Sequence, residues 1–254
     1  MDFAAFDLAA LLPFIAVGFA AQLVDGALGM AFGIISNTAL VAVLGVPPAV
    51  ASQRIHVVEC FTTAISGISH LLHRNIDARL FFRLLIPGMI GGVAGAYLLT
   101  SLDASVVKPF VLLYLAGIGV YLLVRGLLYP PQTREAKHIA PLGLIGGFLD
   151  AAGGGGWGPV VTSNLLIQGA DPRKVVGTVN AVEFFLTLTV SAAFIWRLGF
   201  ADLAGATLGI LIGGMFAAPI GAWAAKHFSP KVMLVLVGVV LTLTSVYGVY
   251  RAWA

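Results

Sequence analysis

Charged residues are scarce in this chain, and their scarcity restricts its class. Only 10% of the 254 residues are Asp, Glu, Lys or Arg, 59% are hydrophobic, and the mean hydropathy is +1.01. A soluble domain carries about 25% charged residues, so this composition excludes a water-exposed globular fold. Helices of about 20 apolar residues cross a bilayer and satisfy their own backbone hydrogen bonds. We therefore expect an all-α membrane protein that contacts lipid and has no nucleic-acid partner.

Cysteine and catalytic motifs are also nearly missing. The single cysteine, Cys60, excludes an internal disulfide. The stretch "GGGGWG" is not a phosphate loop, because no Lys-Ser/Thr pair follows it. His56 and Glu59 have the spacing of metal ligands, but no other His lies near them in sequence. We expect no metal, no cofactor and no catalytic residue. An intramembrane enzyme that uses His56 and Glu59 is kept as an alternative.

Glycine-rich stretches interrupt the apolar sequence. Short polar connectors predict about ten helical segments, at residues 8–24, 30–45, 49–72, 80–99, 105–128, 139–152, 157–169, 173–196, 201–225 and 230–252. The first two segments of each half are short for a membrane span, and they flank "DGALGMAFG" and "DAAGGGGWG". Such runs of small residues do not favour a continuous helix. We predict broken or re-entrant helices there that meet near the midplane of the membrane.

The two halves of the chain resemble each other. The stretch "PAVASQRIHVVECFTT" at 48–63 matches "PRKVVGTVNAVEFFLT" at 172–187, and "IGG" at 90–92 matches "IGG" at 212–214. Internal repeats of this kind are typical of secondary transporters. We therefore predict two transmembrane repeats of about five helical segments, at 1–128 and 139–254, joined by a cytoplasmic linker at 129–138.

Loop charge predicts how the repeats are oriented. The connectors "HRNIDAR" and "YPPQTREAKH" are basic, and basic loops stay in the cytoplasm. "HRNIDAR" is then inside, whereas the connector at its repeat position, "RLGFAD", falls outside. The two repeats are therefore predicted to have inverted topology, with both termini in the periplasm.

Polar residues gather on one face of the third segment. Ser52, His56, Glu59 and Thr63 share a helical face, and the matching segment carries Asn180, Glu183 and Thr187 on its corresponding face. Glu59 and Glu183 occupy the same repeat position, and an ionisable group inside a membrane is a candidate for function. We expect both to carry coupling protons, because a protonated Glu can donate to an anion. The alternative is that each only forms structural hydrogen bonds to a re-entrant helix.

The interrupted helices predict a substrate site. A helix N-terminus presents free N–H groups and a partial positive charge, which suit an anion. Gly26, Gly29, Gly153 and Gly156 would provide the non-helical backbone. The candidate substrate-binding side chains are Ser36, Asn37, Gln53, His56, Trp157, Thr162, Ser163, Asn164 and Asn180. A role for Arg54 is left open.

The stretches "AQLVDGALGMAFGIISN", "LGVPPAVAS" and "GGFLDAAGGGGWGPVVTS" together resemble the sulfite exporter TauE/SafE family. The resemblance covers nearly the whole chain. It implies a bacterial inner-membrane transporter of sulfur-containing oxyanions such as sulfite, sulfoacetate or other organosulfonates. We therefore expect a secondary active transporter, working as an exporter by alternating access with proton coupling. An anion channel is the alternative, and a homodimer is left open.

The predicted topology can be tested by cysteine labelling from outside the cell. A cysteine introduced near Ser105 should be modified, because the connector there is predicted to be periplasmic. A cysteine near Arg134 should be protected, because the linker is predicted to be cytoplasmic. The reverse pattern would contradict the inverted repeats.

Overall fold

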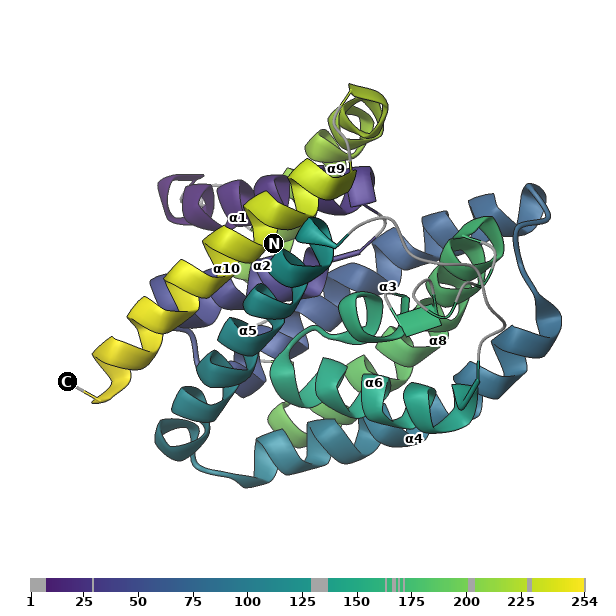
Figure 1. Cartoon of the computed structure of the whole chain (residues 1–254). Coiled ribbons are helices and arrows are strands. Elements are labelled where there is room, and N and C mark those ends of the chain that lie inside the picture. Colours follow the sequence, from purple (N-terminus) through teal and green to yellow (C-terminus); the bar gives the residue numbers. More distant parts are fainter. Residues whose placement is uncertain are drawn as a thin grey trace.

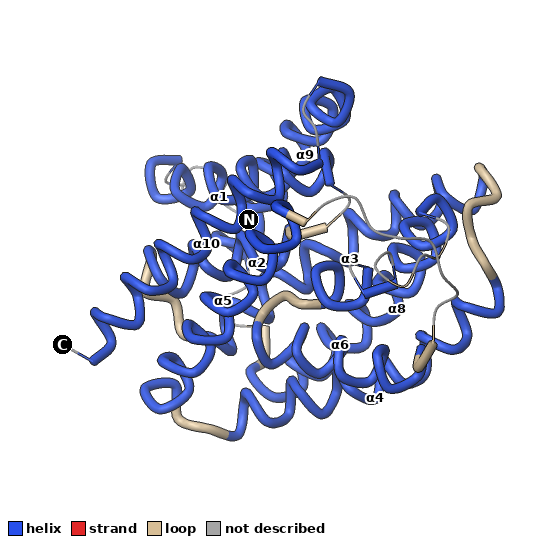
Figure 2. Tube along the Cα trace, in the orientation of Figure 1, coloured by secondary structure: helices blue, strands red, loops and turns tan. Residues whose placement is uncertain are grey.

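The structure, a computed structural model, describes residues 8–28, 30–128, 137–162, 164–165, 168, 170, 172–200, 204–227 and 230–253. Every regular element in these ranges is helical (Figure 2). The elements of the first half are α1 (Leu8–Leu28), α2 (Phe32–Thr38), the π-helical turn η2 (Ala39–Val43), α3 (Pro48–Leu72), α4 (Ala78–Ser101) and α5 (Ala104–Leu127). Those of the second half are α6 (Ile139–Gly153), the π-helical turn η3 (Trp157–Thr162), α8 (Pro172–Leu198), α9 (Ala204–His227) and α10 (Pro230–Trp253). The predicted all-α class is confirmed.

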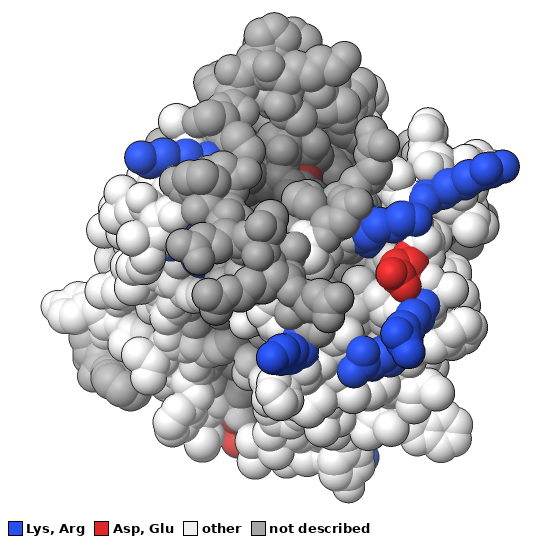
Figure 3. Space-filling model, turned by 45° about the vertical axis from the view of Figure 1, so that its right-hand side comes forward, with Lys and Arg blue, Asp and Glu red and all other residues white. Residues whose placement is uncertain are grey.

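Four helices are long and apolar enough to cross a membrane. They are Pro48–Leu72, Ala78–Ser101, Ala104–Leu127 and the Lys174–Leu198 part of α8. Large apolar side chains on these helices point outward, and Trp196 is 89% exposed. In the described part of the face that Figure 3 shows, most atoms belong to uncharged residues, and most of the Lys and Arg lie on its right-hand side. An apolar exterior of this kind suits lipid rather than water.

One end of the molecule is basic. Exposed Arg74 and Arg79 lie where α3 ends and α4 begins. Lys174, near the start of α8, joins them, because its Nζ donates to the Arg74 carbonyl over 2.8 Å. We call the part that carries these three residues the basic end. The opposite part, where α3 begins near Gln53 and α8 ends near Gly199, is the far end, so α3 and α8 run antiparallel.

Both predicted helix interruptions are present. α1 ends at Leu28 and α2 begins at Phe32, whereas α6 ends at Gly153 and η3 begins at Trp157. Gly154 and Gly155 have φ angles of 70° and 129°, which a residue with a side chain rarely adopts. The non-helical backbone expected around Gly156 is therefore confirmed. Gly29 lies outside the described residues.

The two interruptions touch each other. A Cβ atom at Gly33, in the first turn of α2, would lie 3.0 Å from the Gly155 Cα. A Cβ atom at Gly158, in η3, would lie 3.2 Å from the Met30 Cα. Gly33 and Gly158 hold the same place relative to the two interruptions, so each half packs a small residue against the break in the other half.

The long helices pair across the two halves. α1 packs on α9 and α4 packs on α6, while α3 packs on α8 and α5 packs on α10 (Figure 1). If each helix is replaced by its counterpart in the other half, the same four pairs result. The glycines of the two "IGG" stretches lie at matching crossings. A Cβ atom at Gly91 would collide with the backbone of Leu144 on α6, and one at Gly213 with the backbone of Ile15 on α1. Such close approach is what small residues allow in membranes.

Gly91→Ala should therefore destabilise the protein, by about 1–3 kcal/mol, because α4 and α6 must separate to admit the methyl group. Gly117→Ala on α5 is the matched control, since a Cβ atom there meets nothing within 4 Å. The control should be neutral or gain up to about 1 kcal/mol of helix propensity. Thermal unfolding of the purified variants in detergent measures both. Equal midpoints for the two variants would show that the crossing is loosely packed.

Candidate functional site

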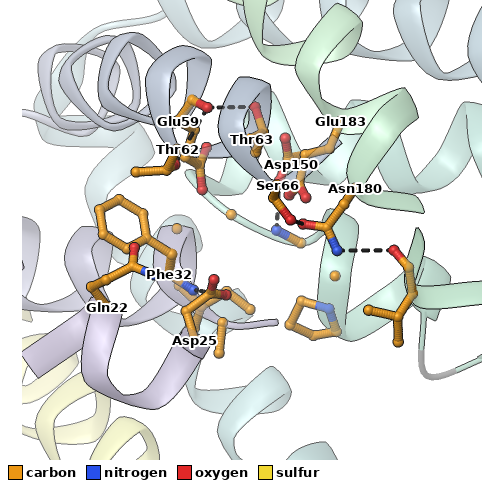
Figure 4. A pocket seen from close by; sticks show the side chains of 18 of the residues that line it. Gln22, Asp25, Phe32, Glu59, Thr62, Thr63, Ser66, Asp150, Asn180 and Glu183 are labelled. Carbon is orange, nitrogen blue, oxygen red and sulfur yellow. Dashed lines mark hydrogen bonds between the residues drawn. The ribbon is translucent and has the colours of Figure 1, made fainter. Parts of the chain in front are cut away.

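A polar cavity of about 390 Å³ lies against the two interruptions and between α3 and α8. Figure 4 shows its side chains approaching from several elements. The polar side chains in its lining are Gln22, Asp25, Glu59, Thr62, Thr63, Ser66, His70, Asp150, Asn180 and Glu183. Among the described residues that line it there is no Lys or Arg. His70 and Val176 lie at its outer part, so the cavity extends toward the basic end.

Two aspartates hold the interruptions in place. The Asp150 Oδ1 atom accepts hydrogen bonds from the backbone N–H groups of Gly156, at 2.8 Å, and Trp157, at 2.9 Å. The Asp25 Oδ1 atom accepts one from the N–H of Phe32, at 3.3 Å. In both halves the carboxylate therefore reaches the residue seven positions ahead, where the next helical segment begins. This is the work of a helix cap, which satisfies N–H groups that have no partner inside the helix.

These caps correct one sequence-based expectation. The sequence predicts free N–H groups at these helix N-termini, but the chain's own carboxylates accept hydrogen bonds from the N–H groups of Phe32, Gly156 and Trp157. Asp25 and Asp150 were not among the predicted site residues. The signal was present, because each is the acidic residue just before a glycine-rich stretch, in "VDG" and in "LDA".

Glu59 and Glu183 enter the cavity from α3 and α8, as the repeat predicted. Figure 4 shows both near Asp150. Glu59 is only 5% exposed, and no other described residue hydrogen-bonds its carboxyl group. A Cβ atom at Gly33 would lie 3.0 Å from Glu59 Oε1, so the glycine leaves room for the carboxyl group. The alternative that Glu59 caps a re-entrant helix is not what the structure shows, because Asp25 and Asp150 do this.

His56 lies behind the cavity rather than in it. Its side chain is fully buried, and its Nε2 atom is 3.1 Å from Asp150 Oδ2. Its Nδ1 atom is 2.7 Å from the Ser52 carbonyl oxygen. On the same face, Ser52 Oγ donates to the Ala151 carbonyl over 2.8 Å. The neighbouring Gln53 donates from Nε2 to the Gly199 carbonyl over 2.8 Å. These bonds join the first half of α3 to α6 and to the end of α8.

The other predicted substrate-binding residues divide into two groups. Asn180 lines the cavity, where its Oδ1 atom accepts from Ser66 Oγ at 3.1 Å, and the backbone at Gly156 lines it too. Seven predicted side chains do not line it, namely Ser36, Asn37, Gln53, His56, Trp157, Thr162 and Asn164. Ser163 lies outside the described residues. Gly26 lies in the last turns of α1, and Gly153 ends α6. Arg54 is on α3 and is not part of the lining.

Several of the seven residues connect parts of the backbone instead. Asn37 Nδ2 donates to the Gly153 carbonyl over 2.7 Å, which ties α2 to the second interruption. The buried Trp157 Nε1 donates to the Val179 carbonyl over 3.3 Å, and Asn164 Nδ2 donates to the Val160 carbonyl over 3.0 Å. Gln22, Thr62, Ser66 and His70 line the cavity but were not predicted, because spacing alone did not show that these positions face α8 and the interruptions.

The sequence is similar to known proteins over most of its length. The family model described as "Sulfite exporter TauE/SafE" matches residues 14–248. The chain is 42% identical over 252 residues to "Probable membrane transporter protein YtnM" of Bacillus subtilis, covering 96% of this chain and 84% of that protein. It is 25% identical over 253 residues to "Probable membrane transporter protein" of Haemophilus influenzae, covering 95% of each. No solved structure matches the chain.

Both relatives are named as probable membrane transporters, and the family is one of transporters rather than of enzymes. The long apolar helices agree with that class, since they fit a multi-pass membrane protein. The match to the family model spans most of the chain, including both interruptions and both glutamates. The chain therefore belongs to the sulfite exporter TauE/SafE family of membrane transporters.

Proposed function

We propose that this protein is a secondary active transporter that exports small sulfur-containing oxyanions, such as sulfite or organosulfonates, by proton-coupled alternating access. The observation that carries this proposal is the polar cavity between two touching helix interruptions. Interruptions at matching places in two repeats are where transporters of this architecture bind their substrates. The helix pairs that survive exchange of the halves support two inverted repeats.

The charges of the lining require a coupling ion. Four carboxyl groups, those of Asp25, Glu59, Asp150 and Glu183, share the cavity without a Lys or Arg among its described residues. Two like charges 4 Å apart repel by about 4 kcal/mol at an effective dielectric constant of about 20. An anion therefore enters only when carboxylates are neutralised, and protonation does this. A protonated Glu donates a hydrogen bond to the anion, and Thr62, Thr63 and Ser66 can donate others.

Glu59 and Glu183 fit this role better than the two aspartates. Asp150 must keep accepting from backbone N–H groups if the second interruption is to stay capped, and Asp25 does the same at the first. Glu59 and Glu183 do not accept these capping hydrogen bonds, which go to Asp25 and Asp150. We therefore assign the coupling protons to Glu59 and Glu183.

The position of the cavity supports loading of the anion from the cytoplasm, as export needs. It extends toward the basic end, which the positive-inside rule places in the cytoplasm of a bacterial inner membrane, with both termini in the periplasm. The anion would then enter from the cytoplasm, where α3 ends near His70. Release would follow at the periplasmic side, after the two repeats rearrange.

The carboxylate-rich lining favours a second candidate substrate, a zwitterionic sulfonate such as taurine. Its ammonium group would pair with ionised carboxylates while its sulfonate accepts from the hydroxyl groups. The two candidates differ in pH dependence. Binding of a simple anion weakens as pH rises, because ionised carboxylates repel it, whereas binding of an ammonium group strengthens.

Glu59→Gln and Glu183→Gln test the coupling. Wild-type affinity for sulfite or sulfoacetate should fall between about pH 5 and 8, by up to about tenfold per pH unit for each proton that binding takes up. Each Gln variant should keep the fold and show a shallower fall, because a neutral amide cannot be deprotonated. Calorimetry on purified protein measures this. Glu135→Gln is the matched control, since Glu135 is the remaining glutamate of the chain and lies in the linker. Wild-type profiles in both variants would contradict the assignment.

Flux through proteoliposomes tests the transport class. Uptake of labelled sulfite should saturate and should accelerate when a proton gradient is imposed, as in a carrier. Flux that rises linearly with concentration and ignores the gradient would indicate a channel instead. A panel of sulfite, sulfoacetate, taurine, sulfate and simple carboxylates identifies the substrate.

A further inference from the structure

The two ends of α3 and α8 are packed differently although the repeat relates them. Toward the basic end, Ser66, His70 and Asn180 line the cavity. The residues at the matching repeat positions are Val190, Phe194 and His56, as the alignment of 48–70 with 172–194 shows. All three are fully buried, and the rings of His56 and Phe194 lie 5.9 Å apart. Residues at matching repeat positions therefore line a cavity toward the basic end but pack into the core toward the far end.

One hydrogen bond closes the packed side. His56 Nε2 meets Asp150 Oδ2 at 3.1 Å. The matching residues of the other side are Asn180 and Asp25, which both line the cavity. Asn180 instead bonds Ser66 and the Val176 carbonyl, and Asp25 accepts from Phe32. The contact therefore exists on one side only, although both sides carry a nitrogen donor and a carboxylate.

We infer that a second substrate path, closed in this structure, lies between the first half of α3 and the second half of α8. His56, Thr187, Val190 and Phe194 would line it, and the same small oxyanion would leave through it. The His56–Asp150 contact keeps this path shut. When the path opens, Asn180 turns to Asp25 and shuts the cavity at the basic end. The inference rests on the alternating access proposed above, and it adds the residues that alternate.

The closed contact also holds a proton. His56 Nδ1 faces the Ser52 carbonyl at 2.7 Å, and a carbonyl only accepts, so Nδ1 carries a hydrogen. The bond between Nε2 and Asp150 then needs a second proton, on one atom or the other. An Asn180–Asp25 contact needs none, because the amide supplies its own N–H. The two contacts, which close opposite ends of α3 and α8, therefore differ in the number of protons that they hold.

Other ionisable groups interact electrostatically with Asp150, so their charges also affect the His56–Asp150 contact. Glu59 on α3, Glu183 on α8 and Tyr114 on α5 face Asp150. Asp25 on α1 faces both glutamates. A test must therefore separate His56 from these carboxyl groups, which the choice of variants at position 56 allows.

The experiment uses single cysteines at two repeat-related positions. Replacing the chain's single cysteine, by Cys60→Ser, gives a cysteine-free background. Ser66→Cys or Val190→Cys is then added, and each protein in proteoliposomes is treated from either side with a membrane-impermeant thiol reagent. Labelling is scaled to that of the denatured protein at the same pH. Ser66→Cys should react from the basic side, whereas Val190→Cys should be protected in the resting protein and should react from the far side when sulfite is added and transport proceeds.

Variants at position 56 test the contact itself. His56→Ala removes the contact, so the rate of labelling at Val190→Cys in the resting protein should rise at least about tenfold. His56→Asn keeps an N–H donor that can reach Asp150, so labelling of Val190→Cys in the resting protein should stay low. Asn180→Ala removes the opposite contact. It should reduce labelling at Val190→Cys during transport, which keeps the inference testable if His56→Ala does not fold.

The outcomes test the second path separately from the identity of the substrate. Val190→Cys that stays protected in His56→Ala while transport continues would overturn the second path. So would labelling of Val190→Cys from the same side as Ser66→Cys. If the labelling pattern exchanges as expected but no sulfur oxyanion is transported, the path stands and the proposed substrate is wrong.

Discussion

A helix that stops inside a bilayer leaves backbone N–H and C=O groups without partners, and lipid cannot supply them. This chain interrupts two helices, and everything else in the fold depends on how those groups are satisfied. Asp25 and Asp150 take the N–H groups where the next segments begin, and Asn37 donates to the carbonyl of Gly153, where α6 ends. Because Asn37 lies in the other half of the chain, the two interruptions hold each other in place.

The packing around the interruptions also holds them in place. Gly33 and Gly158 let the two breaks touch, and Gly91 and Gly213 let α4 and α1 cross their partners at backbone distance. The outer helices thereby brace the breaks without large side chains between them. A polar cavity remains open beside the breaks, between α3 and α8. In the proposed transport cycle, the cost of burying these carboxyl groups couples their protonation to the binding of the anion.

The two halves match in their helix pairs and capping aspartates, but they differ in several side chains around the cavity. Asp25 and Asp150 cap in the same way, and Glu59 and Glu183 enter the same cavity. His56 and Asn180 break the match, because an imidazole holds its carboxylate by way of an extra proton and an amide does not. Phe194 and His70 break it as well, since one fills a core and the other borders a cavity. Substitutions confined to such positions let one framework treat its two ends differently.

The sequence by itself determined the helices, the two interruptions, the repeat and the pair Glu59 and Glu183. These follow from hydropathy, glycine content and helical spacing, which are local properties of the chain. Only the tertiary structure decided which residues, far apart in the sequence, these side chains contact. It turned His56 toward Asp150, 94 residues away, and Asn37 toward Gly153, 116 residues away, so neither side chain lines the cavity. It also placed Asp25 and Asp150 where they accept hydrogen bonds from the N–H groups of Phe32, Gly156 and Trp157. Spacing fixes which face of a helix a residue occupies, but packing alone decides which other segment that face meets.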